Sequence, residues 1–261
     1  RQLCLFEQSL YLNIQAKEAL DQSWNRHKDK APNILKMIAW FNSFSKWVAT
    51  EIIRVEDIKE RVKFMKKFVV VAITLREYNN FNAAQAILAG FNNAAVYRLK
   101  QSWAKVSKEK NFAKYEELKA ELDSTSNYAG YRKALLQSNP PIIPYLGVYL
   151  TDLTFIEDGN KNYLKVQCGR EDIINFEKMR KVAVSIKDIT VYQQTPYNFE
   201  KVDAIYNFFA NQQLPFEEDN PLFQKSRILE PPGDSSGPGS LKKKESLFRK
   251  LSFKMKDKDG K

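Results

Sequence analysis

The chain is poor in the residues on which covalent and metal chemistry most often depends. Its 261 residues include one histidine, His27, and two cysteines, Cys4 and Cys168. One histidine cannot form a multi-histidine metal site, and His27 lies in the polar run WNRHKDKAPN, where a solvated side chain is expected. Two isolated cysteines are too few for a disulfide framework or a zinc site, which favours a reducing, cytoplasmic compartment. We therefore expect no metal, no cofactor and no Cys–His or Ser–His–Asp catalytic set.

Phosphate-binding loops and long hydrophobic runs are also missing. The nine glycines are scattered, and no G-x-x-x-x-G-K-[ST] motif occurs. A chain that acts on a nucleotide must then do so without a loop of that kind. The longest apolar run covers residues 68–73, far short of the roughly 18 residues that indicate a membrane-spanning helix. With 43% hydrophobic and 13% aromatic residues, the composition is typical of a globular protein.

Helical signals dominate most of the chain. Asp57, followed three residues later by Glu60, forms a capping-box pattern. Behind it, apolar residues recur at spacings of three and four: Ile58, Val62, Met65, Phe68, Ala72 and Leu75. Asn82 is predicted to cap a short helix that ends at Gly90. Because no period-two alternation extends beyond a few residues, we predict an all-α fold, a single large domain of roughly ten helices.

A helical hairpin is predicted between residues 139 and 197. Three prolines just before Tyr145 cannot lie inside a helix, so the first helix should start near Tyr145, and Gly159 should end it. The second helix is predicted to open with Glu171 and Asp172, which suit the positive end of a helix dipole. A short polar turn would join the two helices, and the hairpin would protrude from the domain.

A polar stripe follows one side of the first hairpin helix. Thr151, Thr154 and Asp158 are spaced i, i+3 and i+7, on an otherwise apolar helix. Glu157 and Asp158 also lie in the last turn, where the helix dipole disfavours anions by roughly 0.3–1 kcal/mol each. Spacing alone leaves two interpretations open. The stripe is either an ordinary solvated face or a surface that offers a small polar residue and a carboxylate to a partner.

The sequences of several segments resemble those of a known family. The hairpin segment is similar to the helical hairpin of Ras-family guanine-nucleotide exchange factors, in the catalytic domain of the Son-of-sevenless type. Three further segments resemble the other signature blocks of that family, in its order and at about its spacing: APNILKMIAWFN (31–42), REYNNFNAAQAILAGFNNAAVYRL (76–99) and NYAGYRKALLQSNPP (127–141). The N-terminal RQLCLFEQSLY resembles the opening helix. The resemblance covers residues 1–227.

The resemblance implies a guanine-nucleotide exchange factor for a Ras-family small GTPase, Ras or Rap. Such a protein is not an enzyme of covalent chemistry, because it accelerates GDP release by binding the nucleotide-free GTPase better than the loaded one. The resemblance places Thr151, Thr154 and Asp158 on the face that approaches the phosphate and magnesium region of the GTPase. Asp158 would supply negative charge where phosphate oxygens had been, and Thr154 would crowd the magnesium site.

The resemblance also implies a surface that grips the GTPase. Its residues are Leu35, Ile38, Asn92, Tyr97, Asn127, Tyr128 and Tyr145. By residue type alone, Leu35 and Ile38 would be expected in the core. Two positions depart from the family pattern: Ala39 stands where some relatives have arginine, and Gln85 stands where an apolar residue is usual. A non-catalytic module that binds the GTPase without emptying it therefore remains open.

The C-terminal part of the chain differs in composition. We predict a flexible linker over residues 228–240, since EPPGDSSGPGS cannot pack a core. Residues 241–261 hold nine Lys and Arg against three Asp and Glu, which accounts for six of the eleven net positive charges. This tail is predicted to be disordered, or to form an amphipathic helix that recruits the protein to an anionic membrane.

The basic character of the chain leaves one more alternative. A sequence pI near 9.4 would suit a protein that binds a membrane surface or nucleic acid. Outside the tail, however, the net charge is modest, and no interleaving of aromatic and basic residues of an RNA-binding kind is present. We therefore expect no nucleic-acid partner.

Overall fold

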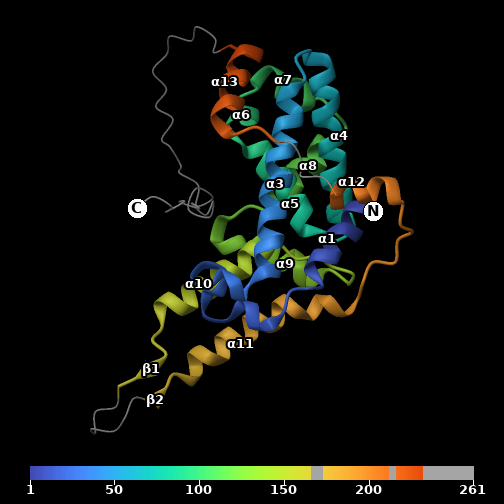
Figure 1. The fold of residues 1–261 in the computed structure, drawn as a ribbon. Helices are drawn as coiled ribbons and strands as arrows, with labels where there is room; N and C mark the ends of the chain where they lie inside the picture. Colours follow the sequence, from blue (N-terminus) through green and yellow to red (C-terminus); the bar gives the residue numbers. More distant parts are fainter. Residues whose placement is uncertain (166–172, 212–215, 232–261) are drawn as a thin grey trace.

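The computed structural model describes residues 1–165, 173–211 and 216–231, and within them the fold is almost entirely helical (Figure 1). The α-helices are α1 (Gln2–Tyr11), α2 (Ser23–Arg26), α3 (Pro32–Arg54), α4 (Ile58–Glu77), α5 (Phe81–Asn92), α6 (Ala94–Tyr97), α7 (Lys100–Val106), α8 (Phe112–Glu121), α9 (Thr125–Gln137), α10 (Leu146–Gly159), α11 (Phe176–Thr190), α12 (Asp203–Asn211) and α13 (Asp219–Leu229). Three 3-10 helices join them: η1 (Ala16–Gln22), η2 (Lys28–Lys30) and η3 (Val191–Gln194). The all-α prediction is confirmed, with more helices in the described part of the chain than the roughly ten that were expected.

The core is organised around the long helix α3. Its 23 residues run through the middle of the molecule, and α5 packs closely along it (Figure 1). Gly90 makes this approach possible, because a Cβ atom there would lie 2.7 Å from the backbone oxygen of Ser45. The prediction that Gly90 ends this helix is wrong, since α5 continues to Asn92. Gly90 serves packing rather than termination.

Of the two predicted N-terminal helix caps, the one for α4 is confirmed and the one for α5 is wrong. The Asp57 carboxylate caps α4 as predicted, accepting hydrogen bonds from the backbone N–H groups of Lys59 and Glu60. Asn82 does not cap α5. Asn80 does, and its side chain accepts a hydrogen bond from the backbone N–H of Ala83. Asn82 lies within the first turn because α5 already begins at residue 81, and its buried amide donates to Glu7.

The hairpin consists of α10 and α11, which extend together away from the body of the molecule (Figure 1). The first helix begins after Tyr145 and ends with Gly159, as predicted. The second begins at residue 176, where the Asn175 side chain caps it, and not at Glu171. Residues 166–172 lie outside the described part of the chain. Between the two helices lies an antiparallel ribbon of β1 (Tyr163–Leu164) and β2 (Ile173–Ile174), and not a short polar turn. The two isoleucines of β2 favour extended backbone.

A buried ion pair braces the two hairpin helices. Lys178 Nζ of α11 lies 2.6 Å from Glu157 Oε2 of α10, and both side chains are at least nine-tenths buried. The same ammonium group donates to Asn162 Oδ1 at 2.5 Å. The unfavourable position of Glu157 in the last turn of α10 thus has a structural explanation, because its charge is compensated from the neighbouring helix.

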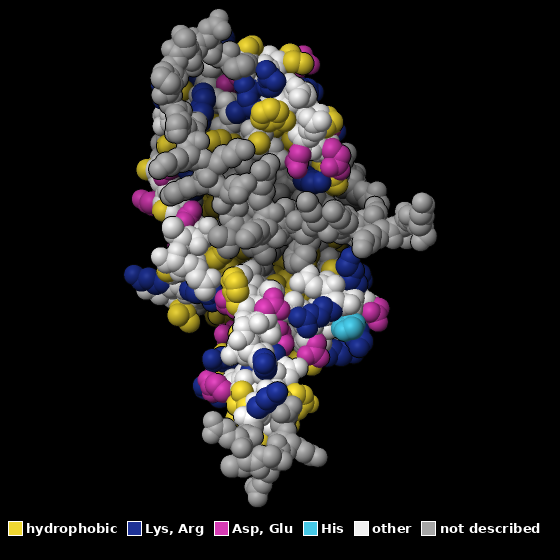
Figure 2. Space-filling model, turned by 90° about the vertical axis from the view of Figure 1, so that its left-hand side faces the viewer, with side chains coloured by type: hydrophobic (Ala, Val, Ile, Leu, Met, Phe, Trp, Pro, Cys, Tyr) yellow, Lys and Arg dark blue, Asp and Glu magenta, His cyan; other side chains and the backbone are white. Residues whose placement is uncertain are grey.

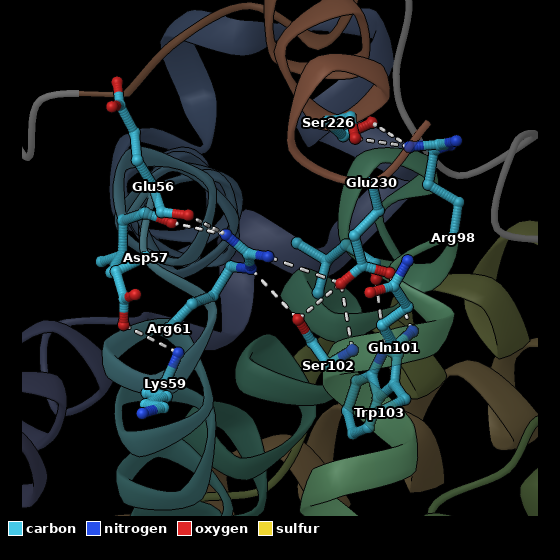
Figure 3. Close-up of polar contacts among 12 residues, drawn as sticks. Glu56, Asp57, Lys59, Arg61, Arg98, Gln101, Ser102, Trp103, Ser226 and Glu230 are labelled. Atoms are coloured by element: carbon cyan, nitrogen blue, oxygen red, sulfur yellow. Dashed lines mark hydrogen bonds and ion pairs between the residues drawn. The ribbon is translucent and has the colours of Figure 1, made fainter. Parts of the chain in front are cut away.

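The C-terminal end of the described chain is fastened to the body by Glu230 (Figure 3). Its buried carboxylate accepts hydrogen bonds from the backbone N–H groups of Gln101 and Ser102 at 2.8 and 3.0 Å. Arg61 of α4 approaches the same carboxylate at 3.5 Å. The predicted boundary between residues 227 and 228 therefore falls inside an ordered element, since α13 continues to Leu229 and its end is held by Glu230. A local composition of Pro and Gly beyond residue 230 could not reveal this long-range contact.

The predicted basic tail, residues 241–261, lies outside the described part of the chain. None of the described helices combines the length and the apolar character needed to cross a membrane.

Candidate functional site

The polar stripe predicted on α10 is present, and its two threonines share one local geometry. Thr151 Oγ1 donates to the backbone oxygen of Gly147, and Thr154 Oγ1 donates to that of Leu150, both at 2.8 Å. Both side chains are half-buried. Because each hydroxyl proton is used within the helix, the threonines offer methyl groups and acceptor lone pairs to a partner, but no free donor.

The carboxylate at the end of the stripe is exposed but not isolated. Asp158 Oδ1 accepts a hydrogen bond from Gln22 Nε2 at 2.8 Å and another from Arg26 Nη2 at 3.3 Å. The side chains of Asp158 and Arg26 remain 59% and 51% exposed. Both partners come from η1 and α2, more than 130 residues away in the sequence. Nothing in the local sequence around residue 158 could have identified them.

The segment that carries Gln22 is also tied to α3. Glu18 of η1 accepts hydrogen bonds from the backbone N–H groups of Asn33 and Ile34, at 2.7 and 3.1 Å, and so caps the first turn of α3. Burial alone would raise the pKa of Glu18, but these bonds, with those from the Asn33 side chain and the Gln15 backbone, outweigh it and lower the pKa. Residues 15–26, which we call the brace segment, therefore contact both α3 and α10.

Two of the predicted gripping residues form an aromatic cluster at the base of α10. The rings of Tyr128 and Tyr145 lie 6.0 Å apart, and Tyr145 also packs 5.2 Å from Phe41 of α3. Both tyrosines are only 7% exposed. Burial raises the pKa of Tyr128 to about 12 and also raises that of Tyr145. In this structure the pair is mainly a packing feature, with its edge at the surface.

A strained turn precedes this cluster. Ser126, Asn127 and Tyr128 have φ angles of 50°, 56° and 59°, and none of them is glycine. Left-handed non-glycine residues each cost on the order of 1–3 kcal/mol and persist only where the surroundings enforce them. Here Arg132 does so: its Nε donates to the Asn127 backbone oxygen at 2.9 Å, and its Nη2 contacts both carboxylate oxygens of Asp152 at 2.8 Å. The turn is thereby linked to α10.

A cavity of about 480 Å³ lies between this turn and the hairpin. Its lining residues are Asn127, Asp152, Phe155, Ile156, Arg180, Lys181, Val184 and Ser185. Phe155 is 63% exposed, so the lining presents apolar surface next to charged groups. The face of the molecule in Figure 2 likewise shows acidic and basic side chains interspersed along the projecting hairpin, with no continuous stripe of one sign among the described residues. The sequence analysis did not identify this cavity.

The remaining gripping residues occupy two other places. Leu35 and Ile38 are half-buried on one face of α3, where they pack against the core and keep an exposed edge. Asn92 and Tyr97 are exposed, Tyr97 at 60%, with Lys100 Nζ 4.4 Å from the centroid of the Tyr97 ring. They lie at the α6 end of the molecule, away from α10 (Figure 1). The candidate residues are therefore spread along one long molecule and do not form a single compact cluster.

The two departures from the family pattern lie in different environments. Ala39 is exposed on α3. Gln85 is 4% exposed inside α5, and its side-chain oxygen has no hydrogen-bond partner in the described part of the chain. Gln85 is thus a core position and cannot contact a partner directly. Within residues 1–165, 173–211 and 216–231, no group of three or more His, Cys, Asp or Glu is placed to hold a metal ion.

Comparison with known proteins agrees with the architecture. The family model of the RasGEF domain matches residues 1–180. Ras guanine nucleotide exchange factor E of Dictyostelium discoideum is 38% identical over 273 residues, covering 88% of this chain and 26% of the relative. Ras guanine nucleotide exchange factor A of the same organism is 42% identical over 214 residues, covering 81% of this chain and 35% of the relative. Ras-specific guanine nucleotide-releasing factor 1 of Homo sapiens is 36% identical over 232 residues, covering 88% of this chain and 18% of the relative.

The chain spans only 13% to 26% of the length of the first three relatives. The family resemblance found in the sequence is nevertheless confirmed, because the family model covers well over half of the chain. The chain belongs to the RasGEF domain family.

Proposed function

We propose that this protein is a guanine-nucleotide exchange factor that accelerates GDP release from a Ras-family small GTPase, Ras or Rap. The observation that carries the proposal is the RasGEF domain match over residues 1–180, which includes the first helix of the projecting hairpin and its exposed carboxylate, Asp158. The names of the relatives describe the same activity for those proteins. An exchange factor makes no covalent bond, so the activity requires no nucleophile, no general base and no bound metal.

The catalytic effect would come from a difference in affinity. A protein that binds the nucleotide-free GTPase better than the loaded GTPase shifts the equilibrium toward release, by tenfold for each ~1.4 kcal/mol of difference. Two like charges 4 Å apart repel by ~4 kcal/mol at the effective dielectric constant near a protein surface. If Asp158 approaches the phosphate oxygens at such a distance, its repulsion is large enough to disfavour bound nucleotide. Thr154, one turn earlier, would crowd the magnesium site with its methyl group.

The grip on the GTPase would use two separate surfaces. The first combines the edges of Leu35 and Ile38 on α3 with Asn127, Tyr128 and Tyr145 at the base of the hairpin. The second is formed by Asn92 and the exposed ring of Tyr97. The half-buried edges of Leu35 and Ile38, beside the buried pair of Tyr128 and Tyr145, are suited to binding a partner because little side-chain entropy is lost.

Release of a fluorescent guanine nucleotide from a panel of Ras, Rap, Ral and Rho-type GTPases tests this function. We expect acceleration for at least one Ras-family member. Asp158→Ala and Thr154→Ala should lower the exchange rate more than they weaken binding to the nucleotide-free GTPase. Glu116→Ala provides the control, since it removes an exposed carboxylate of α8 that is likewise paired with a cation. Wild-type rates in both hairpin variants would contradict the role of the stripe.

A second candidate function is a non-catalytic module that holds the nucleotide-free GTPase. Ala39 and Gln85 depart from the family pattern, and Arg26 offsets part of the Asp158 charge. This candidate requires tight binding of nucleotide-free GTPase without faster nucleotide release, so the same experiment separates the two.

We also propose that the protein is cytoplasmic and that its basic tail recruits it to an anionic membrane. The composition of residues 241–261 supports the proposal, because each basic residue near such a surface contributes about 1 kcal/mol. Deletion after Gly239 should leave exchange in solution intact and slow exchange on lipid-anchored GTPase. Equal sedimentation of the full-length and truncated chains with anionic vesicles at low salt would rule out this tether.

A further inference from the structure

The last two residues of η1, directly before α2, have an unusual backbone. Asp21 and Gln22 have φ angles of 52° and 53°, in the left-handed region, although neither is glycine. Such residues are costly and are kept where surrounding contacts enforce the conformation, often at functional sites. The consequence of the turn is specific: it buries Gln22 to 4% exposure and brings its amide to Asp158 of the hairpin.

Gln22 and Arg26 differ in what they do to Asp158. The Gln22 amide is neutral, donates at 2.8 Å and is held in place by burial. It can therefore fix the orientation of the carboxylate without removing its negative charge. Arg26 lies farther away, at 3.3 Å, with half of its side chain in solvent. Exposed ion pairs of this kind are weak and readily rearranged, because solvent screens the charges and the side chains lose entropy.

The brace segment gives Gln22 a fixed base. Four residues before Gln22, the 1% exposed Glu18 accepts backbone hydrogen bonds from the first turn of α3. The segment therefore holds one end of α3 with Glu18 and the end of α10 with Gln22. Of these two helices, α3 carries Leu35 and Ile38, and α10 carries the stripe of Thr151, Thr154 and Asp158.

We propose that Gln22 is a positioning residue for Asp158, and that the left-handed turn at residues 21 and 22 exists to place its amide there. The inference rests on the proposed exchange function, which it refines. Gln22 does not contact the nucleotide; its hydrogen bond fixes the orientation of the Asp158 carboxylate, at a set position relative to α3. Arg26 contributes less, because it yields to a partner that approaches Asp158.

A double-mutant cycle with Asp158 tests the proposal in the full chain. Gln22→Met keeps the length of the side chain but lacks the donor, and Asp158→Ala removes the group that is positioned. We expect Gln22→Met to lower kcat for nucleotide release about tenfold, the size of one lost hydrogen bond to a charged group, with little change in KM. In the Asp158→Ala background, Gln22→Met should change kcat by less than about twofold, because positioning has nothing left to act on.

Two further variants sharpen the result. Gln22→Glu replaces the donor with a second carboxylate next to Asp158, so it should lower kcat more than Gln22→Met does. Arg26→Ala should change kcat less than about threefold, because its ion pair is exposed. A larger loss in Arg26→Ala than in Gln22→Met would overturn the assignment.

A merely structural role for Gln22 gives a different pattern. It would lower the melting temperature and reduce kcat by the same factor in the wild-type and Asp158→Ala backgrounds, which would refute the proposal. The wild-type protein is measured alongside. If it accelerates release from no GTPase, the exchange function itself fails; if it is active and Gln22→Met is equally active, only the positioning role fails.

Discussion

Removal of the Glu230 carboxylate should be one of the most damaging single changes outside the hydrophobic core. Glu230→Ala leaves the Arg61 guanidinium, whose side chain is 1% exposed, without a counter-charge. Arg61 keeps hydrogen bonds to the backbone oxygens of Val55 and Glu56 and to Ser102 (Figure 3). Breaking a buried ion pair by deleting one partner typically costs ~3–5 kcal/mol, and we expect Glu230→Ala to lower the free energy of unfolding by about that amount.

A second ion pair of the same chain serves as a control, because it has the same distance between nitrogen and oxygen but is exposed. Lys46 and Glu218 also form an ion pair with a 3.5 Å separation between nitrogen and oxygen, the same as for Arg61 and Glu230. The Glu218 side chain is 75% exposed, however, whereas that of Glu230 is 5% exposed. Exposed pairs contribute less than about 1 kcal/mol, so Glu218→Ala should be nearly neutral. Equal separation with unequal effects would show that burial, together with the hydrogen bonds that Glu230 accepts, sets the cost, and that the distance between nitrogen and oxygen does not.

Urea unfolding followed by circular dichroism measures both variants. The double variant Arg61→Met/Glu230→Ala should be less destabilised than the sum of its single variants, because neither charge is then left buried alone. A loss below about 1 kcal/mol in Glu230→Ala, similar to that in Glu218→Ala, would refute this reasoning. Binding to nucleotide-free GTPase provides a second measurement: α13 packs against α6, so its release should also weaken the contact through Tyr97.

Three more predictions concern the interior and the hairpin base. Burial raises the pKa of Glu7 to about 7, so between pH 4.5 and 7 the folded state holds a proton that the unfolded state has released. The free energy of unfolding should therefore fall by on the order of 3 kcal/mol as the pH rises through this range. Urea unfolding at pH 5.5 and 8 measures this difference, and Glu7→Gln should abolish it. Gly147→Ala would place a Cβ atom 2.5 Å from the end of the Tyr145 ring, so it should weaken binding of nucleotide-free GTPase; unchanged affinity would remove Tyr145 from the contact surface. Arg132→Ala should release the left-handed turn and lower exchange more than Arg132→Lys does; equal rates in both would show that the turn holds itself.

Much of the fold could be predicted because its signals are local. The spacing of apolar residues behind Asp57 predicted α4, and the prolines before Tyr145 predicted the start of α10. The errors also have local causes. Two asparagines two residues apart can both cap a helix by local pattern, whereas in the structure Asn80 caps α5 and Asn82 contacts Glu7, a distant residue. The start of α11 was misplaced because acidic residues suit any helix N-terminus, whereas the actual cap is the Asn175 side chain.

The candidate site was less predictable, because its chemistry depends on contacts between distant segments. Spacing correctly put Thr151, Thr154 and Asp158 on one helix face, yet it could not show that Asp158 has a partner. A carboxylate at the C-terminal end of a helix is disfavoured by the dipole and free to rotate. With Gln22 donating from a buried, left-handed position, a hydrogen bond orients the same carboxylate. If an exchange factor works by offering negative charge at one place on its partner, then the direction of that charge matters as much as its presence. The brace segment, which no motif marked, would then determine how well the hairpin works.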